Sequence, residues 1–107
     1  MSGSSRLEQL REMLADDPDD PFTRYALAME LRGLGRAEEA AGELQRVLDE
    51  APEYLPTYHQ LARLLHETGH GQRARQVATQ GIELAGKQGQ AHAQAELEDL
   101  LRELEEA

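Results

Sequence analysis

The sequence predicts an all-α protein, a solenoid of helical hairpins with about six helices in one domain. Three observations predict this fold: similar residues recur at one fixed spacing, apolar residues follow helical intervals, and proline or glycine stands where those intervals end. No segment shows the apolar–polar alternation or the hairpin turns of a β-sheet. The 107 residues suit a single domain, and the absence of cysteine excludes disulfides, thiolate metal sites and thiol nucleophiles.

The fixed spacing is 34 residues. The step carries Gly35, Leu27, Ala28, Leu31, Ala40 and Leu48 to Gly69, Leu61, Ala62, Leu65, Ala74 and Ile82. Backwards it carries Pro52, Leu48 and Leu44 to Pro18, Leu14 and Leu10. A helix pair repeated in this way has an apolar face that it cannot bury alone, so neighbouring pairs are expected to stack.

Capping and stop residues place the helices. Ser5 with Glu8 has the spacing of a capping box that starts the first helix at Arg6, and Asp20 is expected to cap the second helix with Pro21 in its first turn. Residues 1–5 are expected to be disordered. The expected helices cover about 6–15, 21–33, 37–50, 56–67, 72–84 and 90–105.

Each expected helix carries an apolar stripe at helical spacing. The stripes are Leu7, Leu10, Met13 and Leu14; Ala26, Leu27, Met29 and Leu31; Ala40, Leu44, Val47 and Leu48; Tyr58, Leu61, Ala62 and Leu65; Ala74, Val77, Ala78 and Ile82; and Ala93, Leu97, Leu100, Leu101 and Leu104. Gly81 lies inside the fifth helix and is expected to weaken it by roughly 1 kcal/mol relative to alanine. The step of 34 fails in the last helix, whose acidic outer face is expected to end the stack.

These residues resemble the tetratricopeptide repeat, a helix–turn–helix unit of 34 residues. The resemblance is carried by Leu27-Ala28, Leu31, Gly35, Ala40, Leu44 and Pro52, and in the next copy by Leu61-Ala62, Leu65, Gly69 and Ala74. It implies a right-handed solenoid in a domain covering 6–107, with repeats at about 21–54 and 55–88 and a capping helix at 90–105. The chain departs from the family pattern at Arg24, where a large apolar residue is usual, and at Gly81 and Gly86, which replace alanine and proline.

The resemblance also implies a concave groove, lined by the first helix of each repeat, that binds peptides. The matching positions here are Phe22, Tyr25, Met29, Arg32, His59, Gln60, Arg63 and His66. Arginine can hold a carboxylate through two parallel hydrogen bonds, and aromatic side chains supply rigid apolar area, so the expected ligand has apolar side chains and a carboxylate. The alternative is that these are ordinary surface residues. A known chaperone-tail clamp of lysine and asparagine is missing, because Tyr25, Met29 and Gln60 take its places.

The segment His66-Glu67-Thr68-Gly69-His70 matches the H-E-x-x-H pattern of zinc hydrolases. That chemistry needs both histidines one turn apart on a single helix, with the glutamate activating water. The repeat register instead places His66 and Glu67 at the end of a helix and His70 in a turn, and neither Glu98 nor His92 lies at a recognised spacing for a third ligand. A zinc hydrolase therefore stays a remote alternative, and adventitious zinc binding is a simpler interpretation of the pair of histidines.

Charge and motif content limit the remaining function classes. The net charge of −10 disfavours nucleic acid or an anionic membrane as the main partner, and no apolar run is long enough to span a bilayer. No phosphate-binding loop, dinucleotide fingerprint or nucleophile elbow is present. We expect a cytoplasmic, non-catalytic module that needs no cofactor and no metal and binds a protein or peptide, as a monomer or weak homodimer. Self-association is the alternative function.

Overall fold

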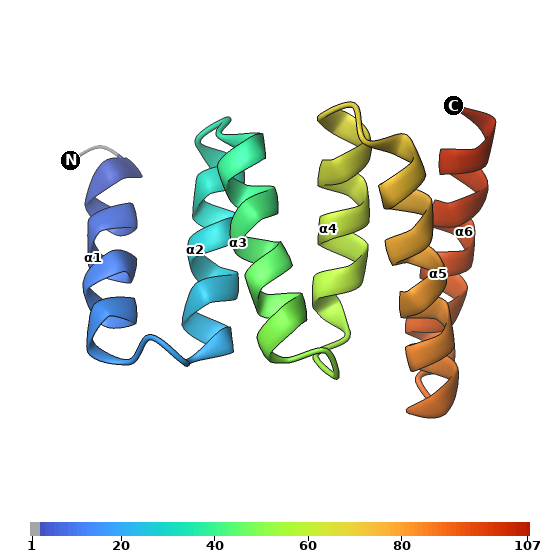
Figure 1. The fold of residues 1–107 in the computed structure, drawn as a ribbon, viewed down its shortest axis with the longest axis horizontal. Helices are drawn as coiled ribbons and strands as arrows, with labels where there is room; N and C mark the ends of the chain where they lie inside the picture. The colour runs from blue at the N-terminus through green and yellow to red at the C-terminus, as the bar shows by residue number, and fades with distance from the viewer. Residues whose placement is uncertain (1–2) are drawn as a thin grey trace. The chain divides into compact units, whose positions relative to one another are not determined.

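The computed structural model describes residues 3–107, with side chains from Arg6 onward. Its helices are α1 (Gly3–Asp16), α2 (Pro21–Gly33), α3 (Ala37–Glu50), α4 (Pro56–Glu67), α5 (Gly71–Lys87) and α6 (Ala91–Glu106) (Figure 1). No strand occurs in this described part, so the predicted all-α class is confirmed. The helices fall into two compact units, one up to Pro52 with α1–α3 and one from Glu53 with α4–α6.

The boundaries of α2, α3 and α4 agree with those expected from the sequence. Asp20 caps α2 as predicted, because its side chain accepts a hydrogen bond from the backbone N–H of Phe22 at 3.0 Å. The predicted start of α1 is wrong: the helix begins at Gly3, so Ser5 lies within it rather than at its N-cap. The side chain of Ser5 lies outside the described residues, and so does the expected disorder of residues 1–2.

The fifth helix is longer than predicted. It runs to Lys87 rather than to Leu84, whereas the equivalent helix α3 stops at Glu50. Pro52 disfavours helical backbone in the residue before it and so limits α3, but Gly86 takes the same position in the second repeat and imposes no such stop. The loss of this proline explains why α5 continues for another turn before α6 begins.

Three turns share one hydrogen-bond pattern and one requirement for glycine. Gly35, Gly69 and Gly89 have φ of 78°, 87° and 69°, a left-handed conformation that other residues adopt only at a cost. At the first turn the N–H of Arg36 donates to the carbonyl of Leu31 at 2.9 Å, which is the Schellman pattern. The same bond runs from His70 to Leu65 and from Gln90 to Ala85. The third turn, at Gly89, lies in the break expected between the fifth and the last helix, although no specific turn residue was predicted there.

In the first unit the predicted stripe of α3 is buried in full, at Ala40, Leu44, Val47 and Leu48. The prediction for α2 is partly correct: Leu27 and Leu31 are buried, but Ala26 and Met29 are half-buried and Ala28 is buried instead. The prediction for α1 is only partly correct: Leu7 and Leu10 are buried, but Met13 is 52% exposed. At the 34-residue step Met13 corresponds to the buried Val47 of α3, which packs beside α2, and no described helix precedes α1 in that way.

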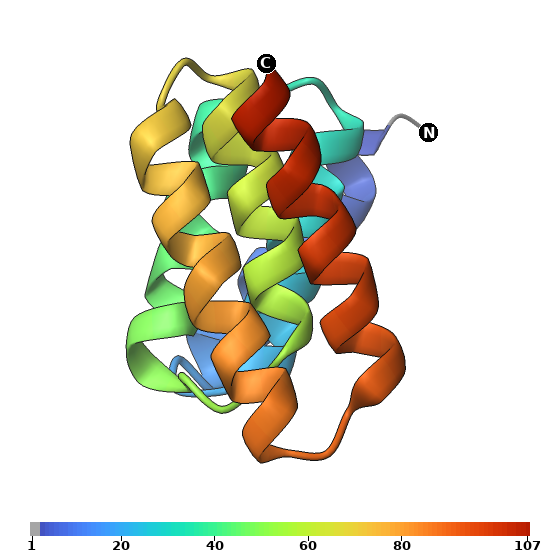
Figure 2. The ribbon, with the colours of Figure 1, turned by 90° about the vertical axis from the view of Figure 1, so that its right-hand side faces the viewer.

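In the second unit α5 packs beside both α4 and α6, and the three helices lie together in Figure 2. Tyr58 and Leu61 of α4, Val77 and Ala78 of α5, and Leu97, Leu100 and Leu104 of α6 are buried. Gly81 lies at the centre of this packing. A β-carbon there would lie 2.7 Å from the Tyr58 Cβ, closer than real side chains approach, and 3.0 Å from the Leu97 Cδ1, a tight contact. The glycine that weakens an isolated helix is therefore required by the close approach of its neighbours.

Candidate functional site

Four of the predicted binding residues lie on α2. Tyr25, Met29 and Arg32 fall at intervals of four and three residues and are half-buried, while Phe22, in the first turn, is 62% exposed. The core residues Leu27 and Leu31 lie at other positions of the same helix and are buried. The helix therefore carries aromatic, thioether and guanidinium groups that are at least partly accessible to solvent.

The other four predicted residues lie on α4. His59, Gln60 and Arg63 are half-buried, and His66 is exposed in the last turn of the helix. His59, Arg63 and His66 repeat the intervals of four and three residues seen on α2. Because α2 and α4 belong to different units, a single groove that both helices line stays a prediction.

Arg24, the residue before Tyr25 on α2, forms a buried ion-pair cluster that the sequence did not predict. Its side chain is buried next to Tyr25 in sequence, with 4% of the residue exposed. The guanidinium donates to Glu43 Oε1 at 2.7 Å and to the carbonyl of Pro18 at 3.0 Å, and its Nε lies 3.6 Å from Glu50 Oε1. Glu43 and Glu50 are seven residues apart and so share one face of α3. That spacing opposite an arginine was the signal that could have predicted the cluster.

The N-termini of α2 and α4 differ in how their polar groups are satisfied. Asp20 accepts a 2.6 Å hydrogen bond from the Thr23 hydroxyl as well as the bond from the Phe22 N–H. The hydroxyl bond, together with the backbone bonds, lowers the pKa of the Asp20 carboxyl below its usual value. Thr57 stands one repeat after Thr23, where no aspartate is available. Its hydroxyl is fully buried and has no hydrogen-bond partner in the described part of the protein.

The H-E-x-x-H segment is divided between two helices, as the repeat register predicted. His66 and Glu67 end α4, Gly69 turns the chain with φ of 87°, and His70 precedes α5. The two histidines therefore lack the single-helix geometry of a zinc hydrolase. Among the described residues no cluster of three or more histidine, aspartate or glutamate side chains is arranged to hold a metal ion.

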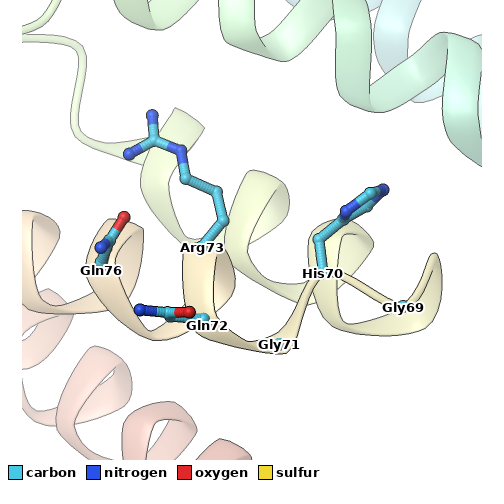
Figure 3. Close-up of a pocket in the computed structure, with 6 residues that line it drawn as sticks. All are labelled: Gly69, His70, Gly71, Gln72, Arg73 and Gln76. Atoms are coloured by element: carbon cyan, nitrogen blue, oxygen red, sulfur yellow. The ribbon is translucent and has the colours of Figure 1, made fainter.

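An open hollow of about 440 Å³ lies where α5 begins. It is lined by Gly69, His70, Gly71, Gln72, Arg73 and Gln76. The side chains of His70 and Arg73 project to the same side of the ribbon (Figure 3). This hollow was not predicted, because its residues come from the turn and from the second helix of the repeat rather than from the first.

Comparison with known proteins connects the repeat to a family. A family model described as tetratricopeptide repeat matches residues 31–97. A TPR repeat-containing protein of Pseudomonas aeruginosa is 33% identical over 101 residues, which make up 94% of this chain and 96% of that protein.

No helix in the described part of the chain is both long enough and apolar enough to cross a membrane.

Solved structures share the fold. The solution structure of a tetratricopeptide repeat domain protein from Salinibacter ruber is 35% identical, with a TM-score of 0.77 over 83% of this chain and 90% of that one. The TPR2B domain of yeast Sti1, solved in complex with pHsp70, has a TM-score of 0.89 over 97% of this chain and 83% of that one, at 14% identity. At that identity the likeness to Sti1 concerns the fold alone.

Proposed function

The chain belongs to the tetratricopeptide repeat family, and from this premise we propose that it is a non-catalytic protein–protein interaction module that binds a peptide segment of a partner. Family membership supports the general class, and the Sti1 domain of the same fold was solved with pHsp70. The proposed peptide-binding residues are Phe22, Tyr25, Met29 and Arg32 on α2 of the first unit, and His59, Gln60, Arg63 and His66 on α4 of the second unit.

The exposure of Phe22 is the observation that carries the proposal. It is the only phenylalanine of the chain and is 62% exposed, so a large aromatic side chain remains outside the core. Burying such a ring in a complex releases it from water, which favours binding. Arg32 of α2 and Arg63 of α4 add guanidinium groups that can hold a carboxylate of the ligand.

The test combines identification of a partner with two point variants. A partner captured from the source cells is reduced to its binding peptide, and its affinity is measured by calorimetry. We expect Tyr25→Ala and Arg63→Ala each to weaken binding about tenfold or more, because aromatic and arginine side chains dominate such interfaces. Arg46→Ala is the matched control, since Arg46 is exposed on α3 and outside the proposed surface. Unchanged affinity in both variants would contradict the proposal.

A further inference from the structure

The segment 54–82, which contains α4 and most of α5, carries the opposite charge to the rest of the chain. It holds three arginines and one glutamate and so has a net charge of +2 with neutral histidines, in a chain of net charge −10. The remaining residues therefore carry −12. Three of the four histidines also lie in this segment. The charge of the molecule is thus divided along the sequence, with one basic hairpin in an acidic protein.

The basic side chains of this hairpin reach solvent around the turn between its helices. We call Arg63, His66, His70, Arg73 and Arg75 the cationic hairpin surface. His66, His70 and Arg75 are exposed, and Arg63 and Arg73 are half-buried. His70 and Arg73 line the hollow at the start of α5, where their side chains project to one side (Figure 3). Of these five residues, His70 and Arg73 lie at the hollow, and Arg63, His66 and Arg75 do not line it.

Three arginines outside this hairpin form ion pairs with carboxylates of the chain. Ion pairs join Arg24 to Glu43, Arg36 to Glu39 and Arg102 to Asp99. Within the part of the chain that the structure describes, Arg63 and Arg75 form no ion pair. A guanidinium without an internal carboxylate can pair with a carboxylate of another molecule, and Arg75 is exposed for such a contact.

We propose that the cationic hairpin surface docks an acidic segment of a partner protein. This inference rests on the proposed function and specifies the chemistry of the partner. At physiological salt, charges more than about 8 Å apart are largely screened, so a short acidic segment on the hairpin interacts mainly with the local positive charge. A nucleic acid duplex or an anionic bilayer extends beyond the hairpin and meets the negative remainder of the chain. Two copies of the chain, each at −10, also repel each other.

The experiment is an NMR titration of the whole chain with a capped oligoglutamate peptide, at low salt and again at about 0.15 M salt. We expect the amide signals of residues 63–76 to shift most, with smaller shifts at the higher salt. The double variant Arg63→Glu with Arg75→Glu should weaken binding at least about tenfold. Arg11→Glu with Arg46→Glu is the matched control, because it changes the net charge equally on exposed positions of α1 and α3. Should the first double variant fail to fold, Arg75→Glu alone, on an exposed position, replaces it.

Several results would overturn the inference. The inference is wrong if the amide signals of residues 63–76 do not shift on addition of oligoglutamate. It is also wrong if the two double variants weaken binding equally, because net charge alone would then explain binding. Tighter binding of a DNA duplex to the same amides would identify a nucleic acid surface instead. Shifts of these amides on dilution without peptide would identify a second copy as the occupant.

Failure of this inference can be told apart from failure of the proposed function. A natural partner that is weakened by Tyr25→Ala and Arg63→Ala but unaffected by Arg75→Glu leaves the proposed function intact and ends the inference. A partner whose affinity is unchanged by both Tyr25→Ala and Arg63→Ala contradicts the proposed function, whether or not oligoglutamate binds.

Discussion

Arg24 and Tyr58 occupy the same position of successive repeats, one in each unit of the molecule, and both are buried. Arg24 is buried because its charge is paired with Glu43 and its guanidinium donates hydrogen bonds to the Glu43 carboxylate and the Pro18 carbonyl. Tyr58 meets it by shape, since Gly81 leaves the space that its ring occupies. The same position of a repeat can therefore hold a buried charged residue or a buried aromatic residue. Each needs a suitable residue on the second helix of the repeat: Glu43 for Arg24, and Gly81 for Tyr58.

The residues on the facing helix show this dependence. Gly81 lies opposite Tyr58, whereas the equivalent residue of the first repeat is the buried Val47. Burial raises the pKa of the Tyr58 hydroxyl, and the charge of Glu53 adds to the effect. A raised pKa favours the neutral phenol in the folded state, so this contribution to stability is present below about pH 10 and is lost as the pH rises through the raised value.

Removal of the buried arginine should have the largest effect on stability. Arg24→Ala leaves Glu43 and the Pro18 carbonyl without their partner and opens a cavity, so we expect a loss of about 3 kcal/mol in the free energy of unfolding. Urea unfolding measures it. Arg46→Ala, on the exposed side of α3, is the control and should change stability by less than about 0.5 kcal/mol. Equal effects of the two variants would show that the buried ion pairs contribute nothing.

Two glycine-to-alanine variants should change stability in opposite directions. Gly81→Ala places a β-carbon against Tyr58 and Leu97, and we expect a net loss of about 1–2 kcal/mol despite the better helix propensity of alanine. Gly42→Ala, in the middle of α3 with no atom within 4 Å of the added carbon, should gain about 0.5–1 kcal/mol. Thermal and urea unfolding measure both. A gain for Gly81→Ala would refute the packing account of Tyr58.

The two equivalent threonines provide a third test of how the repeats differ. Thr57→Val removes a buried hydroxyl that has no partner, so we expect a gain of about 1 kcal/mol. Thr23→Val removes a hydroxyl that donates to Asp20, so we expect a loss of about 1 kcal/mol. Both variants keep the shape of the side chain, and urea unfolding compares them. Losses of similar size in both would mean that Thr57 has a bonding role of its own.

The smallest effect concerns pH and the cap of α2. The lowered pKa of Asp20 means that its stabilising contribution is present above about pH 4 and is lost as the pH falls through the lowered value. Titration of the carboxyl group by NMR should give a pKa below 3.8, and Thr23→Val should move it upward. A pKa at or above 3.8 in the unsubstituted protein would contradict the hydrogen bonds assigned to this carboxyl.

Local signals in the sequence predicted most of the fold. Asp20 and Gly35 delimit α2, and Pro52 limits α3, because each of these residues has a conformational effect that needs no tertiary contact. The sequence was less informative where contacts between helices determine burial. Met13 continues an apolar stripe but has no described helix to cover it, and the sequence gives no sign that Tyr58 and Leu97 approach Gly81 closely.

The candidate site was less predictable than the fold. Helical spacing placed Tyr25, Met29 and Arg32 on one face of α2, and the helix bounds agree. The Arg24 cluster joins groups 19 and 26 residues apart in the sequence. The seven-residue spacing of Glu43 and Glu50 puts both on one face of α3, but it does not show which residue that face meets. The hollow at His70 likewise depends on how a turn and the start of a helix are oriented in space.

The burial of Tyr58 supplies an optical reporter of folding. The chain contains no tryptophan and three tyrosines, so its intrinsic fluorescence comes from phenol rings alone. Tyr25 belongs to the first unit, while Tyr54 and Tyr58 belong to the second. Replacing Tyr25 and Tyr54 by phenylalanine would confine the emission to the ring that lies against Gly81, and opening of the second unit could then be followed without an attached dye.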